Sequence, residues 1–188
     1  QPFNHMIMPL ASAEDKRTQV IWGLRDFELR FGRKPEGMWL PETAVDLATL
    51  EVLADHDIAF TVLAPHQAAR VRLNENAEWR AVDDAQIDTT RPYVQRLPSG
   101  RSIAIFFYAG PTSRAVAFEG LLKNGEIFAQ RLLTLFNNSH TGPQLGHIAT
   151  DGETYGHHHR HGDMALAYAL YFLESKGLAK LTNYGEYL

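Results

Sequence analysis

A continuous run of apolar and β-branched residues occupies positions 58–63, with the sequence Ile-Ala-Phe-Thr-Val-Leu. A run without polar alternation is typical of a strand that is buried on both faces, and such strands belong to parallel sheets. Parallel strands need crossover connections, which are usually helices. The run therefore predicts an α/β fold in which helices lie between the strands.

Helical patterns before this run support that interpretation. Ser12 is a suitable N-cap for a first helix, and the apolar positions from Val20 to Phe31 are spaced four, three and four residues apart. The segment Thr43–Asp46 has capping-box spacing for a second helix. Short apolar runs at 6–10 and 37–41 are predicted strands. The first third of the chain is thus predicted to have the order β-α-β-α-β.

The remainder of the chain is predicted to continue one domain that covers residues 1–188, with an irregular insertion and hairpin around 65–101. Pro-Ser-Gly at 98–100 separates two strand-like runs, which is typical of a β-hairpin. The other predicted elements are helices at 112–122, 126–136 and 163–176 and a strand at 144–149, followed by a polar loop at 150–162.

Composition excludes several classes of protein. The 188 residues are 45% hydrophobic and 21% charged, which is the balance of a globular chain. The net charge of −4 and the lack of a basic run argue against a nucleic-acid partner. No apolar stretch approaches 18 residues, so we expect no membrane partner, and the absence of cysteine excludes disulfides and thiolate chemistry. We expect a cytoplasmic protein and, because the chain starts with Gln-Pro-Phe, a fragment or a processed product.

Two carboxylates fall directly after predicted strands, where α/β folds place their chemistry. Glu42 follows Pro41 and lies near Trp39, and Asp151 precedes Gly152 and lies near Tyr155. Each has a simpler interpretation, since a Glu at such a place often begins a helix and an Asp-Gly pair often forms a turn. Together they suggest the paired carboxylates of glycoside hydrolysis, one as nucleophile and one as general acid.

Histidines form the third notable feature. Four of the nine lie in the stretch His157-His158-His159-Arg160-His161, and such tracts can bind metals. Adjacent residues of an extended loop point in opposite directions, so we predict that this cluster is not a catalytic metal site. The isolated His5 precedes an apolar run and, by itself, suggests a structural residue.

The motifs resemble those of glycoside hydrolase family 57, a group of α-amylase-like enzymes. The stretch 37–42, Gly-Met-Trp-Leu-Pro-Glu, resembles the nucleophile region of that family. The stretch 150–156, Thr-Asp-Gly-Glu-Thr-Tyr-Gly, resembles its acid/base region, and His5 with the run to Leu10 resembles an upstream motif. The three motifs occur in the family's order, with a histidine tract that suggests an uncharacterised subgroup.

The resemblance implies a fold and a mechanism. The fold would be a partial (β/α)7-type barrel, TIM-like, without the first strand motif and the C-terminal helical domain. Glu42 would be the nucleophile and Asp151 the general acid/base of a retaining glycoside hydrolase or transglycosylase on α-linked glucan or oligosaccharide, with carboxyl groups about 5–5.5 Å apart. The predicted substrate-binding residues are His5, Trp39, Glu153, Tyr155 and His157.

Two other functions remain open at this point. One is a metal-dependent polysaccharide deacetylase on a related barrel, with Asp151 and the histidines as ligands. The other is a non-catalytic carbohydrate-binding remnant. The glycosidase hypothesis needs no metal and no organic cofactor, and its partner is a carbohydrate substrate.

Overall fold

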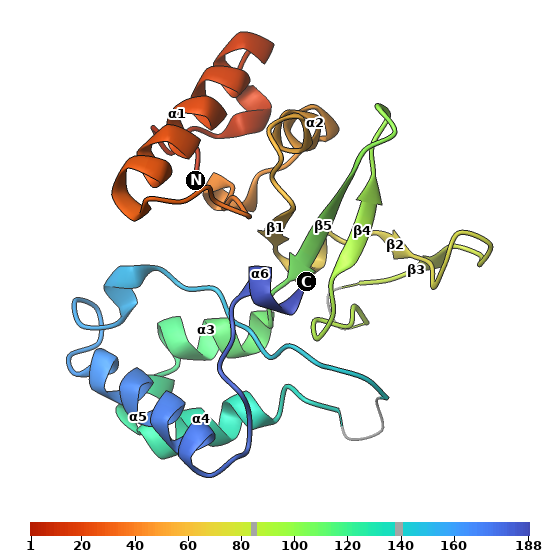
Figure 1. Ribbon diagram of the computed structural model, residues 1–188. Coiled ribbons are helices and arrows are strands. Elements are labelled where there is room, and N and C mark those ends of the chain that lie inside the picture. Colours follow the sequence, from red (N-terminus) through yellow and green to blue (C-terminus); the bar gives the residue numbers. More distant parts are fainter. Residues whose placement is uncertain (84–85, 138–140) are drawn as a thin grey trace. The chain divides into compact units, whose positions relative to one another are not determined.

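The computed structural model describes residues 1–83, 86–137 and 141–188, and it divides into two compact units (Figure 1). Unit 1 comprises residues 1–64, 92–107 and 188, and unit 2 comprises residues 65–91 and 108–187. Within the described ranges, no helix is long and apolar enough to cross a membrane.

The sheet of unit 1 has three strands in the order β1-β5-β4. The predicted buried strand forms β1 (Phe60–Leu63), which pairs in parallel with β5 (Ser102–Phe107). The predicted hairpin is also present, because β4 (Tyr93–Arg96) pairs with β5 in antiparallel orientation. The parallel pair confirms the α/β class, while the hairpin makes this sheet mixed.

Two helices accompany this sheet in unit 1. Helix α1 (Ala13–Phe31) begins at Ser12, whose hydroxyl accepts a hydrogen bond from the backbone N–H of Asp15 at 3.1 Å, as the sequence predicts. The predicted apolar face is only partly correct, since Phe31 is 64% exposed whereas Lys16 is buried. The Lys16 ammonium is tolerated there because it pairs with Asp46 at 2.9 Å.

Helix α2 (Leu47–Asp55) begins three residues later than the capping-box pattern predicts. Its N-cap is Asp46, whose carboxylate accepts hydrogen bonds from the backbone N–H and the hydroxyl of Thr49. Thr43 lies instead in a separate turn of 3₁₀ helix, η2 (Pro41–Thr43). Asp46 therefore serves two helices, as the cap of α2 and as the partner of Lys16 on α1.

The two predicted strands at 6–10 and 37–41 do not form. Residues Met8–Leu10 form a 3₁₀ turn, η1, with Pro9 in its first positions, where proline needs no N–H partner. The segment 37–41 is extended but makes only one bridge to the sheet, between Gly37 and Phe60. A Cβ on Gly37 would lie 2.2 Å from the Phe60 ring, so only glycine allows this approach.

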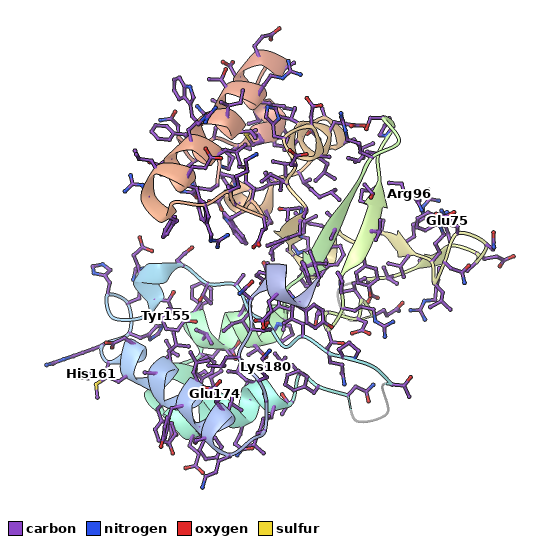
Figure 2. All side chains as sticks on the ribbon, viewed as in Figure 1. Glu75, Arg96, Tyr155, His161, Glu174 and Lys180 are labelled. Carbon is purple, nitrogen blue, oxygen red and sulfur yellow. The ribbon has the colours of Figure 1, made fainter. Side chains whose placement is uncertain are left out.

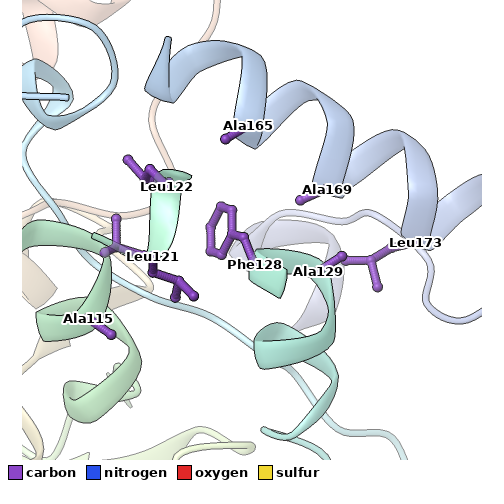
Figure 3. Packing of buried hydrophobic residues seen from close by; sticks show 9 residues of the cluster. Ala115, Leu121, Leu122, Phe128, Ala129, Ala165, Ala169 and Leu173 are labelled. Carbon is purple, nitrogen blue, oxygen red and sulfur yellow. The ribbon is translucent and has the colours of Figure 1, made fainter. Parts of the chain in front are cut away.

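Unit 2 is organised around helices α3 (Gly110–Phe118), α4 (Gly125–Leu133) and α5 (Gly162–Ser175), with the 3₁₀ turn η4 (Leu121–Lys123) between the first two. All three helices were expected from the sequence. Figure 3 shows the fully buried ring of Phe128 between Leu122 and the small side chains of α5. Ala165 and Ala169 allow α5 to approach α4 closely, and Gly125 has no room for a Cβ against Tyr168.

The other elements of unit 2 are short. The hairpin of β2 (Arg70–Val71) and β3 (Arg80–Ala81) falls in the predicted irregular insertion. Three further turns are η3 (Pro65–Gln67), η5 (Gly152–Thr154) and α6 (Tyr184–Tyr187). The predicted strand at 144–149 is wrong, because this segment belongs to no sheet. The described residues thus contain five short strands in two sheets, which do not close a barrel.

Candidate functional site

Glu42 lies at the end of an extended segment that runs beside β1 in unit 1. The backbone N–H of Met38 donates to the Phe60 carbonyl at 3.1 Å, and that of Ala59 donates to the Glu36 carbonyl at 2.8 Å. Leu40 is fully buried, so the segment is anchored by packing as well as by hydrogen bonds. The sheet of unit 1 therefore fixes the position of the turn that contains Glu42.

The turn at Glu42 has an unusual backbone. Glu42 and Thr43 have φ angles of 56° and 53°, and His5 has a φ of 54°. This left-handed region is unfavourable for residues with a Cβ, at a cost on the order of 1–2 kcal/mol each. Strained non-glycine residues are concentrated at functional sites, and two of these three, His5 and Glu42, occur at positions that the sequence motifs place in the site.

Two of these strained residues meet through their side chains. The Nε2 atom of His5 lies 3.7 Å from a carboxylate oxygen of Glu42, although 37 positions separate them in the sequence. The other ring nitrogen lies 3.1 Å from the amide oxygen of Gln1, so Nδ1 carries a hydrogen and donates it. When Nε2 is protonated as well, the ring forms an ion pair with the carboxylate.

Trp39 occupies the same extended segment. Its neighbours Met38 and Leu40 are buried, whereas Trp39 is 37% exposed, as expected from the alternation of an extended chain. Trp39 thus lies on the same extended segment as Glu42, three residues before the carboxylate that faces His5. An accessible indole is a suitable surface for the apolar face of a sugar ring.

The segment before Asp151 is held in unit 2 by contacts other than a strand ladder. The carbonyl of His147 accepts a hydrogen bond from the backbone N–H of Ala109 at 3.0 Å. The N–H of Ala149 donates to the buried hydroxyl of Ser113 at 3.1 Å, and that hydroxyl donates to the Ala109 carbonyl at 2.9 Å. These contacts to the start of α3 replace the pairing that the sequence predicted.

Asp151 itself lies at the start of the turn η5. Its carbonyl accepts a hydrogen bond from the Thr154 N–H at 3.1 Å, while its exposed side chain does not cap the turn. Tyr155 is half-buried, packs against the helical core of unit 2 and accepts a hydrogen bond from the Thr150 hydroxyl at 3.0 Å. The carboxylate of Asp151 is therefore presented on a loop whose base is anchored on both sides.

The histidine tract continues this loop (Figure 2). The Glu153 carbonyl accepts hydrogen bonds from the N–H groups of His157 and His158, and the rings of these two histidines meet edge to face at 5.0 Å. His159 turns away, with Nε2 2.9 Å from the Ala117 carbonyl. In the part of the chain that the structure describes, no three His, Asp or Glu side chains are grouped so that they could hold a metal ion.

A buried histidine that the sequence motifs do not include lies near this loop. His147 is 9% exposed, and burial lowers its pKa to about 4. Its ring contacts Tyr184, whose own pKa is raised by burial to about 12. The available signal in the sequence was a single histidine inside the apolar run 144–149.

The predicted site residues thus form two groups. His5 faces Glu42 in unit 1, to which Trp39 also belongs, and Asp151, Glu153, Tyr155 and His157 lie on one loop of unit 2. The distance between the two carboxyl groups stays a prediction.

Glycoside hydrolases generally use a pair of carboxylates, and this α/β scaffold has exposed carboxylates at the two predicted positions, Glu42 and Asp151. The comparison with protein families defines the group more closely. The model of glycosyl hydrolase family 57 matches residues 1–188, and the chain belongs to this family.

Parts of several solved enzyme structures share the fold of this chain. A branching enzyme of this family from Pyrococcus horikoshii matches with a TM-score of 0.76 and 19% identity, over 97% of this chain and 43% of that one. An exo-type maltose-forming amylase from Pyrococcus sp. ST04 matches with a TM-score of 0.71 and 19% identity, over 99% and 29%. A 4-α-glucanotransferase from Thermococcus litoralis matches with a TM-score of 0.63 and 20% identity, over 96% and 24%.

The chain thus spans less than half the length of each of these enzymes. At identities of 19–20%, these matches show a shared fold. No curated protein matches the chain significantly.

Proposed function

We propose that this chain is the catalytic part of a retaining glycoside hydrolase or transglycosylase that acts on α-linked glucan or oligosaccharide, built on part of a (β/α)7-type barrel. The observation that carries the proposal is the pair of His5 and Glu42, two exposed side chains on left-handed backbone with 3.7 Å between Nε2 and Oε1. Membership of family 57 supports the reaction class. The similar branching enzyme, amylase and glucanotransferase support an α-glucan as the substrate.

In this proposal Glu42 is the nucleophile. Its carboxylate attacks the anomeric carbon and the glycosidic C–O bond breaks, which gives a covalent glycosyl-enzyme. Asp151 gives its proton to the leaving oxygen, and the departing sugar leaves as an alcohol. Asp151 then takes a proton from water or from an acceptor hydroxyl, whose oxygen displaces Glu42, so that the anomeric configuration is retained.

The surrounding side chains would bind the sugar. The His5 imidazole is near enough to Glu42 to hydrogen-bond the hydroxyl groups of a sugar in that position, and Trp39 offers a ring face for stacking. Glu153, Tyr155 and His157 would line the side of the acid/base loop. Hydrolysis and transfer share the glycosyl-enzyme, and they differ only in whether water or a sugar hydroxyl accepts the glycosyl group.

The decisive experiment replaces the nucleophile. We expect Glu42→Gln to lower kcat on α-linked oligosaccharides by on the order of a thousandfold or more, because an amide cannot form the glycosyl-enzyme. Binding of the sugar should change little, since the amide is nearly isosteric with the carboxylate. The measurement is the initial rate of reducing-end release, together with the Kd for a maltooligosaccharide by calorimetry.

Glu36→Gln is the matched control. Glu36 lies six residues earlier in the same segment, and its side chain forms an exposed ion pair with Arg33 at 3.7 Å. This variant should keep the wild-type rate. If Glu42→Gln also keeps the wild-type rate, Glu42 is not the nucleophile.

A further inference from the structure

His147 is a buried histidine that the proposed chemistry does not use, yet both of its ring nitrogens are engaged. Nε2 lies 3.0 Å from the carbonyl oxygen of Thr89, which can only accept, so Nε2 carries the hydrogen. Nδ1 of the neutral ring then accepts a hydrogen bond from the Tyr184 hydroxyl at 2.9 Å. The two rings also meet edge to face with their centroids 5.3 Å apart. This environment selects one tautomer and one orientation of the imidazole.

The backbone around His147 leads directly to Asp151. The His147 carbonyl accepts a hydrogen bond from the N–H of Ala109. Two residues further on, the N–H of Ala149 donates to the hydroxyl of Ser113. Asp151 follows two residues later. Because the segment belongs to no sheet, these separate contacts and the His147 ring fix its course where a ladder of strand hydrogen bonds is missing.

The turn α6 contacts the same segment at a second place. The hydroxyl of Tyr187 lies 3.0 Å from the Pro143 carbonyl and 3.3 Å from the Thr90 carbonyl. The Thr90 carbonyl also accepts a hydrogen bond from the N–H of Leu145 at 2.8 Å. Both tyrosines of α6 therefore bind residues that lie four to eight positions before Asp151, although α6 follows Asp151 by more than 30 residues in the sequence.

We propose that His147 and Tyr184 are positioning residues, which hold the segment before Asp151 in the place from which that carboxyl group can act. The proposal rests on the acid/base role proposed for Asp151. The side chains do not touch the substrate in this account. They act through the backbone of residues 147–151, and a small displacement of a catalytic group is enough to cost a large part of the rate.

The test removes one hydroxyl group and keeps the ring. Tyr184→Phe loses the hydrogen bond to Nδ1, while the edge-to-face contact with His147 and the Nε2 bond to Thr89 remain possible. Tyr171→Phe is the matched control, because Tyr171 belongs to the same unit and is 72% exposed. Amide hydrogen exchange of the whole chain reports the order of the segment independently of activity. Initial rates on a maltooligosaccharide report the consequence for catalysis.

We expect Tyr184→Phe to speed exchange at the amides of Leu145 and Ala149 by roughly tenfold or more, with exchange at Ala169 in the core of α5 unchanged. Further, kcat should fall by about tenfold or more with KM within a factor of two, since only the position of the acid is disturbed. Tyr171→Phe should match the wild type in both measurements.

Three results overturn the proposal. Exchange at Leu145 and Ala149 equal to that of Tyr171→Phe shows that the contact does not hold the segment. Exchange that rises equally at Ala169 shows a general loss of stability, and an unchanged kcat shows that the segment does not position Asp151. A wild-type chain that is inactive on α-glucans contradicts the proposed function instead, and the exchange data then still decide whether Tyr184 orders the segment.

Discussion

The turn that carries Glu42 and the loop that carries Asp151 are built in different ways. Glu42 lies on left-handed backbone, directly after a segment bonded to β1, and its side chain faces His5. Asp151 has an ordinary extended conformation, with φ −62° and ψ 145°. Its place depends on contacts made by the residues before it, to α3 and to the C-terminal turn α6.

The difference shows two ways to hold a carboxylate outside regular secondary structure. At Glu42 the backbone of the turn itself is strained, and the packing of the anchored segment before it offsets this strain. At Asp151 the backbone is relaxed and remote side chains supply the order. The turn of Glu42 should therefore respond most to changes of backbone conformation, and the loop of Asp151 most to the loss of distant hydrogen-bonding groups.

The largest effect is expected from removing the second carboxylate. Asp151→Asn should lower kcat on a natural α-glucan by on the order of 10²–10⁴, the range of general acid catalysis. The loss should be much smaller on an aryl glycoside, whose leaving group needs no proton. The measurement is kcat on both substrates.

Asp163→Asn is the control for this change, because Asp163 is an exposed carboxylate in the first turn of α5. It should react with both substrates like the wild type. Equal losses on the two substrates in Asp151→Asn would contradict an acid role, and the two carboxylates would then not form a pair.

The next largest effect concerns pH and the anchor of the Asp151 loop. Burial lowers the pKa of His147 from 6.5 to about 4, so the folded state keeps the ring neutral where an unfolded chain binds a proton. The free energy of unfolding should therefore fall by about 3 kcal/mol as the pH is lowered from 6.5 to 4. This contribution of the neutral His147 ring should be fully present above pH 6.5.

This prediction is checked by NMR titration of the His147 ring and by urea unfolding at several pH values. A pKa of His147 near 6.5 in the folded protein would contradict it.

A smaller effect is expected from the hydroxyl that binds the same segment. Ser113→Ala removes the acceptor of the part-buried Ala149 N–H, which should lower the free energy of unfolding by about 1 kcal/mol, the lower end of the cost of an unpaired N–H. Ser175→Ala is the control, since Ser175 is exposed near the end of α5. Thermal or urea unfolding measures both variants, and equal stabilities would show that Ser113 does not anchor the segment.

The smallest effect is the change in the free energy of unfolding on substitution by glycine, which should have opposite signs at Glu42 and Asp151. Glu42→Gly should raise the free energy of unfolding by about 0.5–1 kcal/mol, because glycine adopts a φ of 56° without strain. Asp151→Gly should lower it by a similar amount, since a φ of −62° brings glycine no relief and the unfolded chain gains freedom. Urea unfolding of both variants checks this, and changes of the same sign would contradict the comparison.

Much of the regular structure could be predicted from local patterns. The run at 58–63 predicted the correct strand, the Pro-Ser-Gly turn predicted the correct hairpin, and the cap at Ser12 predicted the correct start of α1. These signals are local, because hydrophobic period, turn chemistry and capping depend on residues within one or two turns.

The errors have a common origin in contacts between distant residues. The run at 144–149 has the composition of a strand, but its N–H groups are bonded to Thr90 and to Ser113, so it joins no sheet. Similarly, Thr43 has the spacing of a cap, yet Asp46 caps α2 and also pairs with Lys16 of α1. A local pattern cannot show which of two suitable residues finds its partner elsewhere in the chain.

The sequence by itself determined which residues are candidates for the chemistry. The motifs around Glu42 and Asp151, with His5, Trp39 and Tyr155, are readable without coordinates, and the family comparison covers the whole chain. Only the tertiary structure decided that His5 faces Glu42, that both lie on left-handed backbone, and that His147 is buried against Tyr184. The physical reason is that strain, burial and long-range hydrogen bonds arise when distant segments pack together, and no local sequence pattern records them.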